Sequence, residues 1–164
     1  MIQRIQTLFL IIAALALIVM AFYPVVNITE FTAVQSGVLE TDYYNLKVTG
    51  LADPSPESKP QMNSSVALPL MIIVIALLAI IVYSIFRFKL RLYQLKLVKI
   101  GIFLNIILVA GIFLNYFKFF THAQIGSELG LGSYFPLISL VMLVVANRYI
   151  LKDEKLVRSA DRLR

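Results

Sequence analysis

The sequence contains no cysteine, no tryptophan and only one histidine. Without cysteine there can be no disulfide scaffold, no thiolate metal site and no dithiol redox chemistry. Charged residues make up only 15% of the 164 residues, and long stretches contain none. These stretches leave no room for a separate soluble domain of about 100 residues. The composition therefore excludes an ordinary water-soluble globule and most enzyme folds.

Apolar residues are concentrated in four runs, at residues 8–26, 66–86, 100–117 and 134–151. At a rise of about 1.5 Å per residue, runs of this length approach the roughly 30 Å of a bilayer's hydrocarbon core. The runs do not alternate between apolar and polar residues, which selects helices over barrel strands. The sequence predicts an all-α membrane protein, a four-transmembrane-helix bundle that forms a single domain over residues 1–164.

The basic residues indicate an orientation, because Lys and Arg in short loops stay on the cytoplasmic side. Lys47, Lys59 and Lys118 fall on one side of the predicted membrane. All the others fall on the opposite side, at Arg4, Arg87, Lys89, Arg91, Lys96, Lys99, Arg148, Lys152, Lys155, Arg158, Arg162 and Arg164. We expect both termini in the cytoplasm. A cleaved signal peptide is the alternative for the first run, but the run is long and residues 20–24 form a poor cleavage site.

The predicted outer loop, residues 27–65, has two parts. In the first part, apolar residues such as Phe31 and Leu46 alternate with polar ones, and Gln35, Ser36 and Gly37 supply a turn. This pattern predicts a small β-hairpin-like cap between the first two helices. The second part, residues 52–60, is rich in proline and predicts a flexible linker.

The predicted inner loop, residues 87–99, mixes cations with apolar and aromatic residues, a pattern typical of a lipid headgroup surface. The expected inner-leaflet lipid contacts are Arg87, Lys89, Arg91, Lys96 and Lys99. Nucleic-acid binding is the alternative, but the topology already accounts for these basic residues. We therefore expect no nucleic-acid partner.

The last segment, residues 152–164, predicts a helix that continues the fourth span into the cytoplasm, since Leu156, Ala160 and Leu163 recur at helical spacing. It is either a solvated flank on lipid headgroups or a docking helix for another protein. In the second case the expected contacts are Glu154, Leu156, Val157, Arg158, Asp161, Arg162 and Arg164.

Small and polar residues form a stripe on the third predicted helix, where Gly101, Asn105, Gly111 and Asn115 fall on one face. Small residues let helices approach closely, and a buried Asn can bond across them. The stripe is either ordinary helix packing, with Ser139 and Ala146 as the facing surface, or a groove for a lipid or a partner helix.

No residues form a recognisable catalytic or metal site. His122 has no second histidine or cysteine to share a metal with. Glu128 lies in a glycine-rich segment, residues 126–133, that lacks the Lys-Ser/Thr of a phosphate loop and predicts a flexible outer turn. Apart from Arg148 near the end of the fourth run, the spans contain no Asp, Glu, Lys or Arg of the kind that coupled transporters use. We expect no enzyme activity, no cofactor and no metal.

The opening residues 1–7 (MIQRIQT), the Ala146-Asn147-Arg148 triplet and the closing segment 152–164 resemble a domain-of-unknown-function family of small four-span membrane proteins of Bacteroidota. The resemblance implies a bacterial inner membrane and a periplasmic first loop, and no known activity. The layout also resembles eukaryotic tetraspan junction proteins such as claudins. That likeness is architectural only, because the paired loop cysteines of claudins are missing.

The leading functional hypothesis is a non-enzymatic accessory or assembly subunit of a membrane protein complex. Its partners would be membrane lipids and either another membrane protein or a second copy of the chain. The alternative is a protein that binds or transports a lipid or small hydrophobic ligand.

Overall fold

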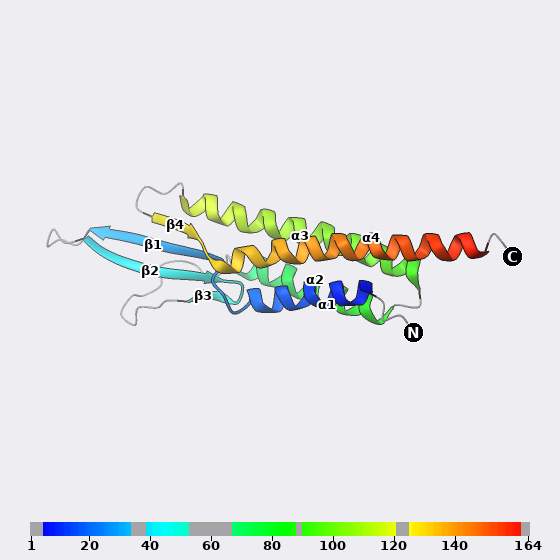
Figure 1. Cartoon of the computed structure of the whole chain (residues 1–164). Coiled ribbons are helices and arrows are strands. Elements are labelled where there is room, and N and C mark those ends of the chain that lie inside the picture. Colours follow the sequence, from blue (N-terminus) through cyan, green and yellow to red (C-terminus); the bar gives the residue numbers. More distant parts are fainter. Residues whose placement is uncertain (1–4, 34–38, 53–66, 88–89, 121–124, 162–164) are drawn as a thin grey trace.

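The computed structural model describes residues 5–33, 39–52, 67–87, 90–120 and 125–161. In these residues, four helices lie side by side and an antiparallel sheet extends from one end of them (Figure 1). The helices are α1 (Ile5–Met20), α2 (Ala67–Phe86), α3 (Arg91–Phe120) and α4 (Phe135–Asp161). Ile5 and Asp161 both lie at the end opposite the sheet, which we call the termini end; the other is the sheet end.

Three segments of the described chain are long and apolar enough to cross a membrane: Ala67–Phe86, Leu92–Phe117 and Leu131–Val157. The fourth helix, α1, is also apolar but has only 16 residues. The predicted fold class, a bundle of four apolar helices with a small strand cap, is confirmed. These helices fit a membrane protein.

The first helix is shorter than the apolar run that predicted it. The run continues to Val26, but α1 ends at Met20 and Pro24 follows in the turn. Proline fixes its own φ and has no N–H to donate, so it favours the end of a helix. Val25 then donates its N–H to the carbonyl of Leu46 at 2.7 Å, and Val26 begins a strand. Apolarity alone does not distinguish a helix from a buried strand.

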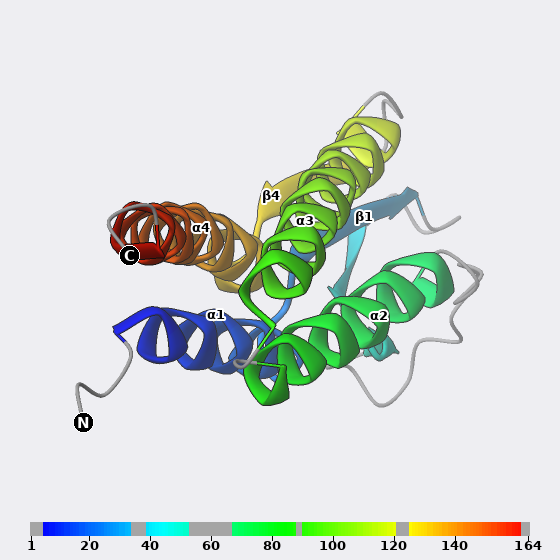
Figure 2. The ribbon, with the colours of Figure 1, turned by 90° about the vertical axis from the view of Figure 1, so that its right-hand side faces the viewer.

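The helices pack as a ring, in which α1 contacts α4 and α2, and α3 contacts α4 and α2 (Figure 2). One continuous apolar core runs through the bundle into the sheet. Its fully buried members include Leu10, Leu17, Leu77, Leu108 and Leu143 from the helices, and Val26 and Leu46 from the strands.

The sheet has the order β3-β2-β1-β4. The predicted hairpin is present as β1 (Val26–Ala33) and β2 (Leu39–Lys47), with Val26 opposite Leu46. A short strand, β3 (Gly50–Ala52), pairs with β2. The predicted turn at residues 35–37 and nearly all of the predicted linker, from residue 53 onward, lie outside the described residues.

The prediction of a flexible turn at residues 126–133 is wrong. Ile125–Leu129 forms β4, which pairs with β1, and Leu131–Tyr134 forms a 3₁₀ helix, η2, that leads into α4. The strand was missed because its partner, β1, is about 100 residues away in the sequence. Glycine and serine are poor strand formers by themselves, so β4 depends on the pairing.

The prediction of a loop over residues 87–99 is wrong for most of its length, because α3 begins at Arg91. Leu95 and Val98 bury their side chains inside the bundle, while Lys96 and Lys99 are exposed. The segment is therefore an amphipathic first part of α3, since one of its faces packs against the other helices.

Candidate functional site

The polar stripe of α3 meets α4 inside the bundle. Asn105 is fully buried and donates a hydrogen bond from Nδ2 to Oγ of Ser139, also fully buried, at 3.1 Å. Gly101 lies between the helices, where a Cβ would come within 3.9 Å of Leu143 and 4.0 Å of Ile80. Ser139 therefore faces the stripe, as the sequence predicted, and this part of the stripe is packed against neighbouring helices.

The other two stripe residues behave differently. A Cβ on Gly111 would lie 3.2 Å from Cδ2 of Leu70, so α2 approaches α3 closely there. Asn115 turns back on its own helix and donates from Nδ2 to the carbonyl of Gly111 at 2.7 Å. The four stripe residues therefore make separate contacts, with α2 and α4 at Gly101, with α4 at Asn105, with α2 at Gly111 and within α3 at Asn115. The possibility that the stripe binds a lipid or a partner helix remains a prediction.

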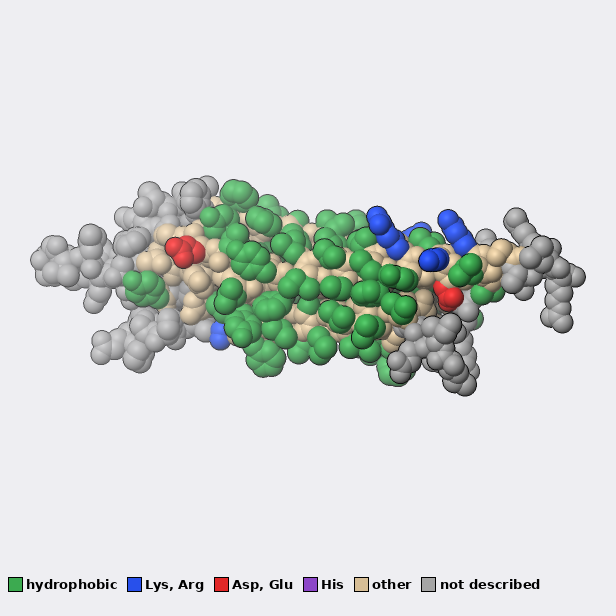
Figure 3. Space-filling model, viewed as in Figure 1, with side chains coloured by type: hydrophobic (Ala, Val, Ile, Leu, Met, Phe, Trp, Pro, Cys, Tyr) green, Lys and Arg blue, Asp and Glu red, His purple; other side chains and the backbone are tan. Residues whose placement is uncertain are grey.

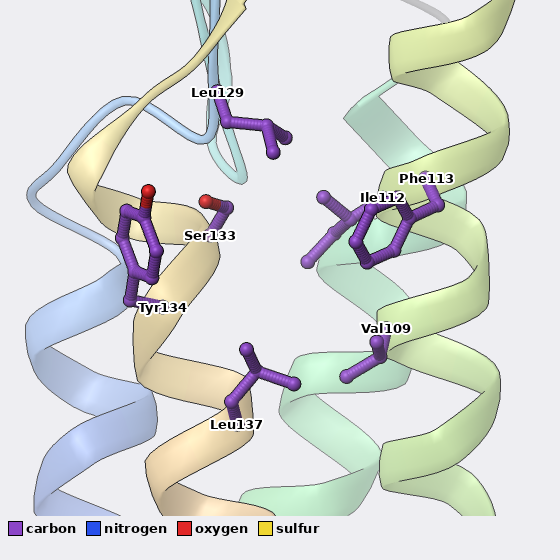
Figure 4. A pocket seen from close by; sticks show the side chains of 7 residues that line it. All are labelled: Val109, Ile112, Phe113, Leu129, Ser133, Tyr134 and Leu137. Atoms are coloured by element: carbon purple, nitrogen blue, oxygen red, sulfur yellow. The ribbon is translucent and has the colours of Figure 1, made fainter.

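A small crevice opens between α3 and α4 near the sheet end (Figure 4). Its volume is about 50 Å³, and its lining residues are Val109, Ile112, Phe113, Leu129, Ser133, Tyr134 and Leu137. Ser133 supplies a hydroxyl, but that Oγ already donates to the carbonyl of Gly130 at 2.7 Å. The crevice can therefore hold apolar groups, such as part of a hydrocarbon chain, and it does not include the stripe residues.

Two glycines join the sheet end to the helices. Gly132 donates its N–H to the carbonyl of Pro24 at 2.7 Å, and Gly130 donates to the carbonyl of Val25 at 3.0 Å. A Cβ on Gly130 would lie 2.3 Å from the oxygen of Pro24, and one on Gly132 would lie 2.7 Å from the same oxygen. These distances are shorter than those of any normal packing contact. The two backbone segments can therefore approach so closely only because glycine has no side chain. The exposed Glu128 beside them belongs to β4.

Basic and aromatic side chains meet at the turn between α2 and α3. The guanidinium carbon of Arg87 lies 5.1 Å from the ring centre of Tyr83 and 6.0 Å from that of Tyr93. Its Nε also donates to the hydroxyl of Tyr83 at 2.9 Å. We call these three residues the Arg87 cluster. Lys89 lies outside the described residues, and the side chain of Arg91 is not described.

The surface of the molecule is divided into zones. Hydrophobic side chains form a broad belt around the bundle, and most of the Lys and Arg side chains visible in Figure 3 gather beyond it at the termini end. This distribution fits a membrane protein, whose apolar belt would face lipid tails and whose basic end would face headgroups.

The fourth helix continues well past the apolar region, as the sequence predicted, and projects beyond the other helices (Figure 1). In this projecting part Leu156 is 60% exposed and Val157 is 37% exposed. Glu154 is half-buried, and the side chains of Arg158 and Asp161 are not described. Arg162 and Arg164 lie outside the described residues. Leu156 and Val157 are thus exposed apolar side chains in a part of α4 that is otherwise rich in charged residues.

Sequence reasoning missed three buried polar residues at the termini end. Gln6, Ser84 and Gln94 are at least 97% buried, and each has a polar side-chain atom without a hydrogen-bond partner in the described chain. A signal for one of them was present, because Gln94 precedes Gly101 by seven residues and therefore shares the face of the stripe. It was overlooked because residues 87–99 were predicted to be a loop.

In the part of the chain that the structure describes, no group of three or more His, Asp or Glu side chains is placed to hold a metal ion. His122 lies outside that part, so the prediction about it is not tested.

Comparison with known proteins agrees with the resemblance noted in the sequence. The family model described as "Domain of unknown function (DUF4293)" matches residues 2–163. No curated protein matches the chain. Because the family model spans nearly the whole chain, from the second residue to the penultimate one, this protein belongs to the DUF4293 domain-of-unknown-function family.

Proposed function

We propose that this protein is a non-enzymatic accessory or assembly subunit of a complex in the bacterial inner membrane. In this proposal all four helices cross the membrane, both termini are cytoplasmic and the sheet is periplasmic. The basic residues at the termini end support this orientation, since Lys and Arg favour the cytoplasmic side. Although α1 has only 16 residues, apolar residues 21–26 extend the run beyond it.

The observation that carries the proposal is the projecting end of α4. A flank that only stops translocation needs a few cations, but this helix continues to Asp161 with Leu156 exposed. Exposed apolar side chains within a charged helix are typical of helix-in-groove recognition. The expected partner is a membrane or membrane-associated protein whose cytoplasmic surface accepts this helix.

A further argument concerns the chemistry of the interior. The described polar groups inside the bundle are amides and hydroxyls, namely Gln6, Ser84, Gln94, Asn105 and Ser139. None of these titrates near neutral pH. Among the described residues, Ser139 is bonded to an amide that cannot act as a base, and Oγ of Ser84 has no hydrogen-bond partner. This supports a structural role for the interior.

Site-specific photo-crosslinking in the native membrane tests the proposal. A photoreactive side chain at position 156 should give a discrete protein adduct. The same group at position 72, where Ile72 is 65% exposed on the apolar belt, serves as the control and should give mainly lipid adducts. If position 156 yields no protein adduct, or only the same products as position 72, α4 is not a docking helix and the proposal fails.

The second candidate function, binding or transport of a lipid or small hydrophobic ligand, is favoured by the crevice between α3 and α4. Its test is to fill the crevice by Leu137→Trp and to measure co-purifying lipid by mass spectrometry. Ile138→Trp, at an exposed neighbour outside the crevice lining, is the matched control. A lower lipid content in the first variant alone would support this function. Equal lipid content would contradict it.

A further inference from the structure

The termini end of the bundle contains polar atoms that are buried and unpaired. Ser84 and Gln94 are 0% exposed, and Gln6 is 3% exposed. The Oγ of Ser84, both amide atoms of Gln94 and Nε2 of Gln6 lack a hydrogen-bond partner in the described chain. Native proteins pair nearly all such atoms, with protein or with ordered water, so a concentration of them calls for a missing partner.

These residues lie in the part of the bundle next to the termini end, within about two helical turns along its axis. Tyr83 and Tyr93 touch with ring centres 6.4 Å apart, so the following residues, Ser84 and Gln94, lie on neighbouring parts of α2 and α3. Both of these residues point into the bundle, since neither is exposed. Figure 2 looks onto this end and shows the first turns of α3 toward the middle of the ring.

The remaining helices contribute residues to the same part of the bundle. Gly101 lies against Ile80 and Leu143, so these three residues mark a common height on α2, α3 and α4. Asn147 lies four residues beyond Leu143, about 6 Å nearer the termini end. Its Oδ1 is also buried and unpaired. On α1, Phe9 stacks on Tyr149 with ring centres 5.3 Å apart, and Gln6 is one helical turn further out.

We propose that Gln6, Ser84, Gln94 and Asn147 form an internal hydration site, in which ordered water completes their hydrogen bonds. We call it the polar layer. It goes beyond the proposed function, because it requires neither a protein partner nor a lipid.

The chemistry of the polar layer selects water over an ion. Its unpaired atoms include donors, at Nε2 of Gln6 and Gln94, and acceptors, at Oε1 of Gln94 and Oδ1 of Asn147. A cation would meet amide N–H groups and no carboxylate from these four residues, and an anion would meet no cation from them. Water both donates and accepts, and a buried water typically makes about three hydrogen bonds to atoms that would otherwise be unpaired.

The rest of the interior provides the contrast. Between the polar layer and the sheet end, Nδ2 of Asn105 donates to Oγ of Ser139, and a single atom of this pair, Oδ1 of Asn105, lacks a partner in the described chain. Around it the core consists of Leu77, Leu108, Leu143 and similar side chains, which offer water no partner. We therefore expect water at the polar layer and a dry apolar core beside it.

Water-edited solid-state NMR on the full-length protein in lipid bilayers tests this inference. Magnetisation should pass quickly from water to the Nε2 groups of Gln94 and Gln6, each assigned by its loss in Gln94→Leu or Gln6→Leu. The backbone amides of Leu77 and Leu108, both fully buried, serve as dry references in the same sample. Transfer to Gln94 that is as slow as transfer to Leu108 would overturn the proposal.

A pair of matched variants sharpens the test. Ser84→Ala removes one partner of the water and should slow transfer to Nε2 of Gln94 by about two-fold or more, since the water loses one of about three bonds. Ser139→Ala makes the same change at a buried serine outside the polar layer and should leave that transfer unchanged. If Ser84→Ala has no effect on Gln94, the four residues do not share bound water.

Discussion

The two ends of the bundle are held together by different kinds of contact. At the sheet end, backbone meets backbone: the N–H groups of Gly130 and Gly132 bond to the carbonyls of Val25 and Pro24. At the termini end, side chains make contacts with one another, as in the Arg87 cluster. A backbone segment cannot move aside without moving its neighbours, whereas a side chain can make room by changing its rotamer. The sheet end should therefore be intolerant of substitution, and the termini end adaptable.

The largest effect is expected from Gly132→Ala. The new Cβ would lie 2.7 Å from the carbonyl oxygens of both Pro24 and Tyr23, so two backbone segments must separate. Overpacking of this kind costs about 1–3 kcal/mol, and we expect the upper part of that range because backbone opposes it. The measurement is the free energy of unfolding in bilayers or mild detergent.

Gly101→Ala is the matched control for that prediction. Its Cβ would meet Leu143 and Ile80 at ordinary contact distances, and alanine is a better helix former than glycine by about 0.5–1 kcal/mol. The control variant should unfold no more easily than the wild type. Equal losses of stability in the two variants would show that the two ends do not differ in the way we describe.

A smaller effect is expected from Gly111→Ala, on α3 toward the sheet end. Its Cβ would lie 3.2 Å from the end of the Leu70 side chain, which can move. We expect a loss of about 1 kcal/mol or less. The second variant Gly111→Ala/Leu70→Val relieves the contact and should recover part of the loss. If the double variant is less stable than the sum of both single changes, the clash is not with Leu70.

The hydrogen bond between Asn105 and Ser139 should contribute less still. Bonds between helices in a membrane average about 0.6 kcal/mol in double-mutant cycles. The cycle consists of Asn105→Leu, Ser139→Ala and the double variant, with unfolding free energy as the readout. A coupling energy indistinguishable from zero would mean that the bond at 3.1 Å adds nothing to stability.

The smallest effect is expected at the termini end. Exposed cation–π contacts contribute about 0.5–1 kcal/mol, and the Arg87 cluster is exposed. We expect a coupling energy near 0.5 kcal/mol between Arg87→Gln and Tyr83→Leu, from the same unfolding measurement. Lys96→Gln, an exposed change on the next helix, should leave stability unchanged and serves as the control. A loss of stability in these variants as large as that in Gly132→Ala would contradict the difference proposed between the two ends.

Local sequence patterns predicted the elements that depend on local physics. The four helices follow from apolar runs, the β1–β2 hairpin follows from alternation around a turn, and the extension of α4 follows from helical spacing after Leu151. The contact between Asn105 and Ser139 could also be predicted from the sequence, since small and polar residues are common at helix interfaces in membranes.

Errors occurred where distant segments decide the local structure. Residues 125–129 form a strand only because β1 offers a free edge, and residues 91–99 are helical because Leu95 and Val98 pack inside the bundle. The buried polar residues at the termini end were missed for the same reason: Gln6 and Ser84 are unremarkable in sequence, and Gln94 lies in the segment that was predicted to be a loop.

The sequence by itself determined that the chain forms apolar helices with most of its basic residues on one side, because the transfer of apolar groups and charges between water and lipid depends on composition. Only the tertiary structure decided where α1 stops, which segment completes the sheet and which polar side chains lack partners. These features depend on contacts between residues far apart in the chain, and such contacts form only when the helices and strands have packed together.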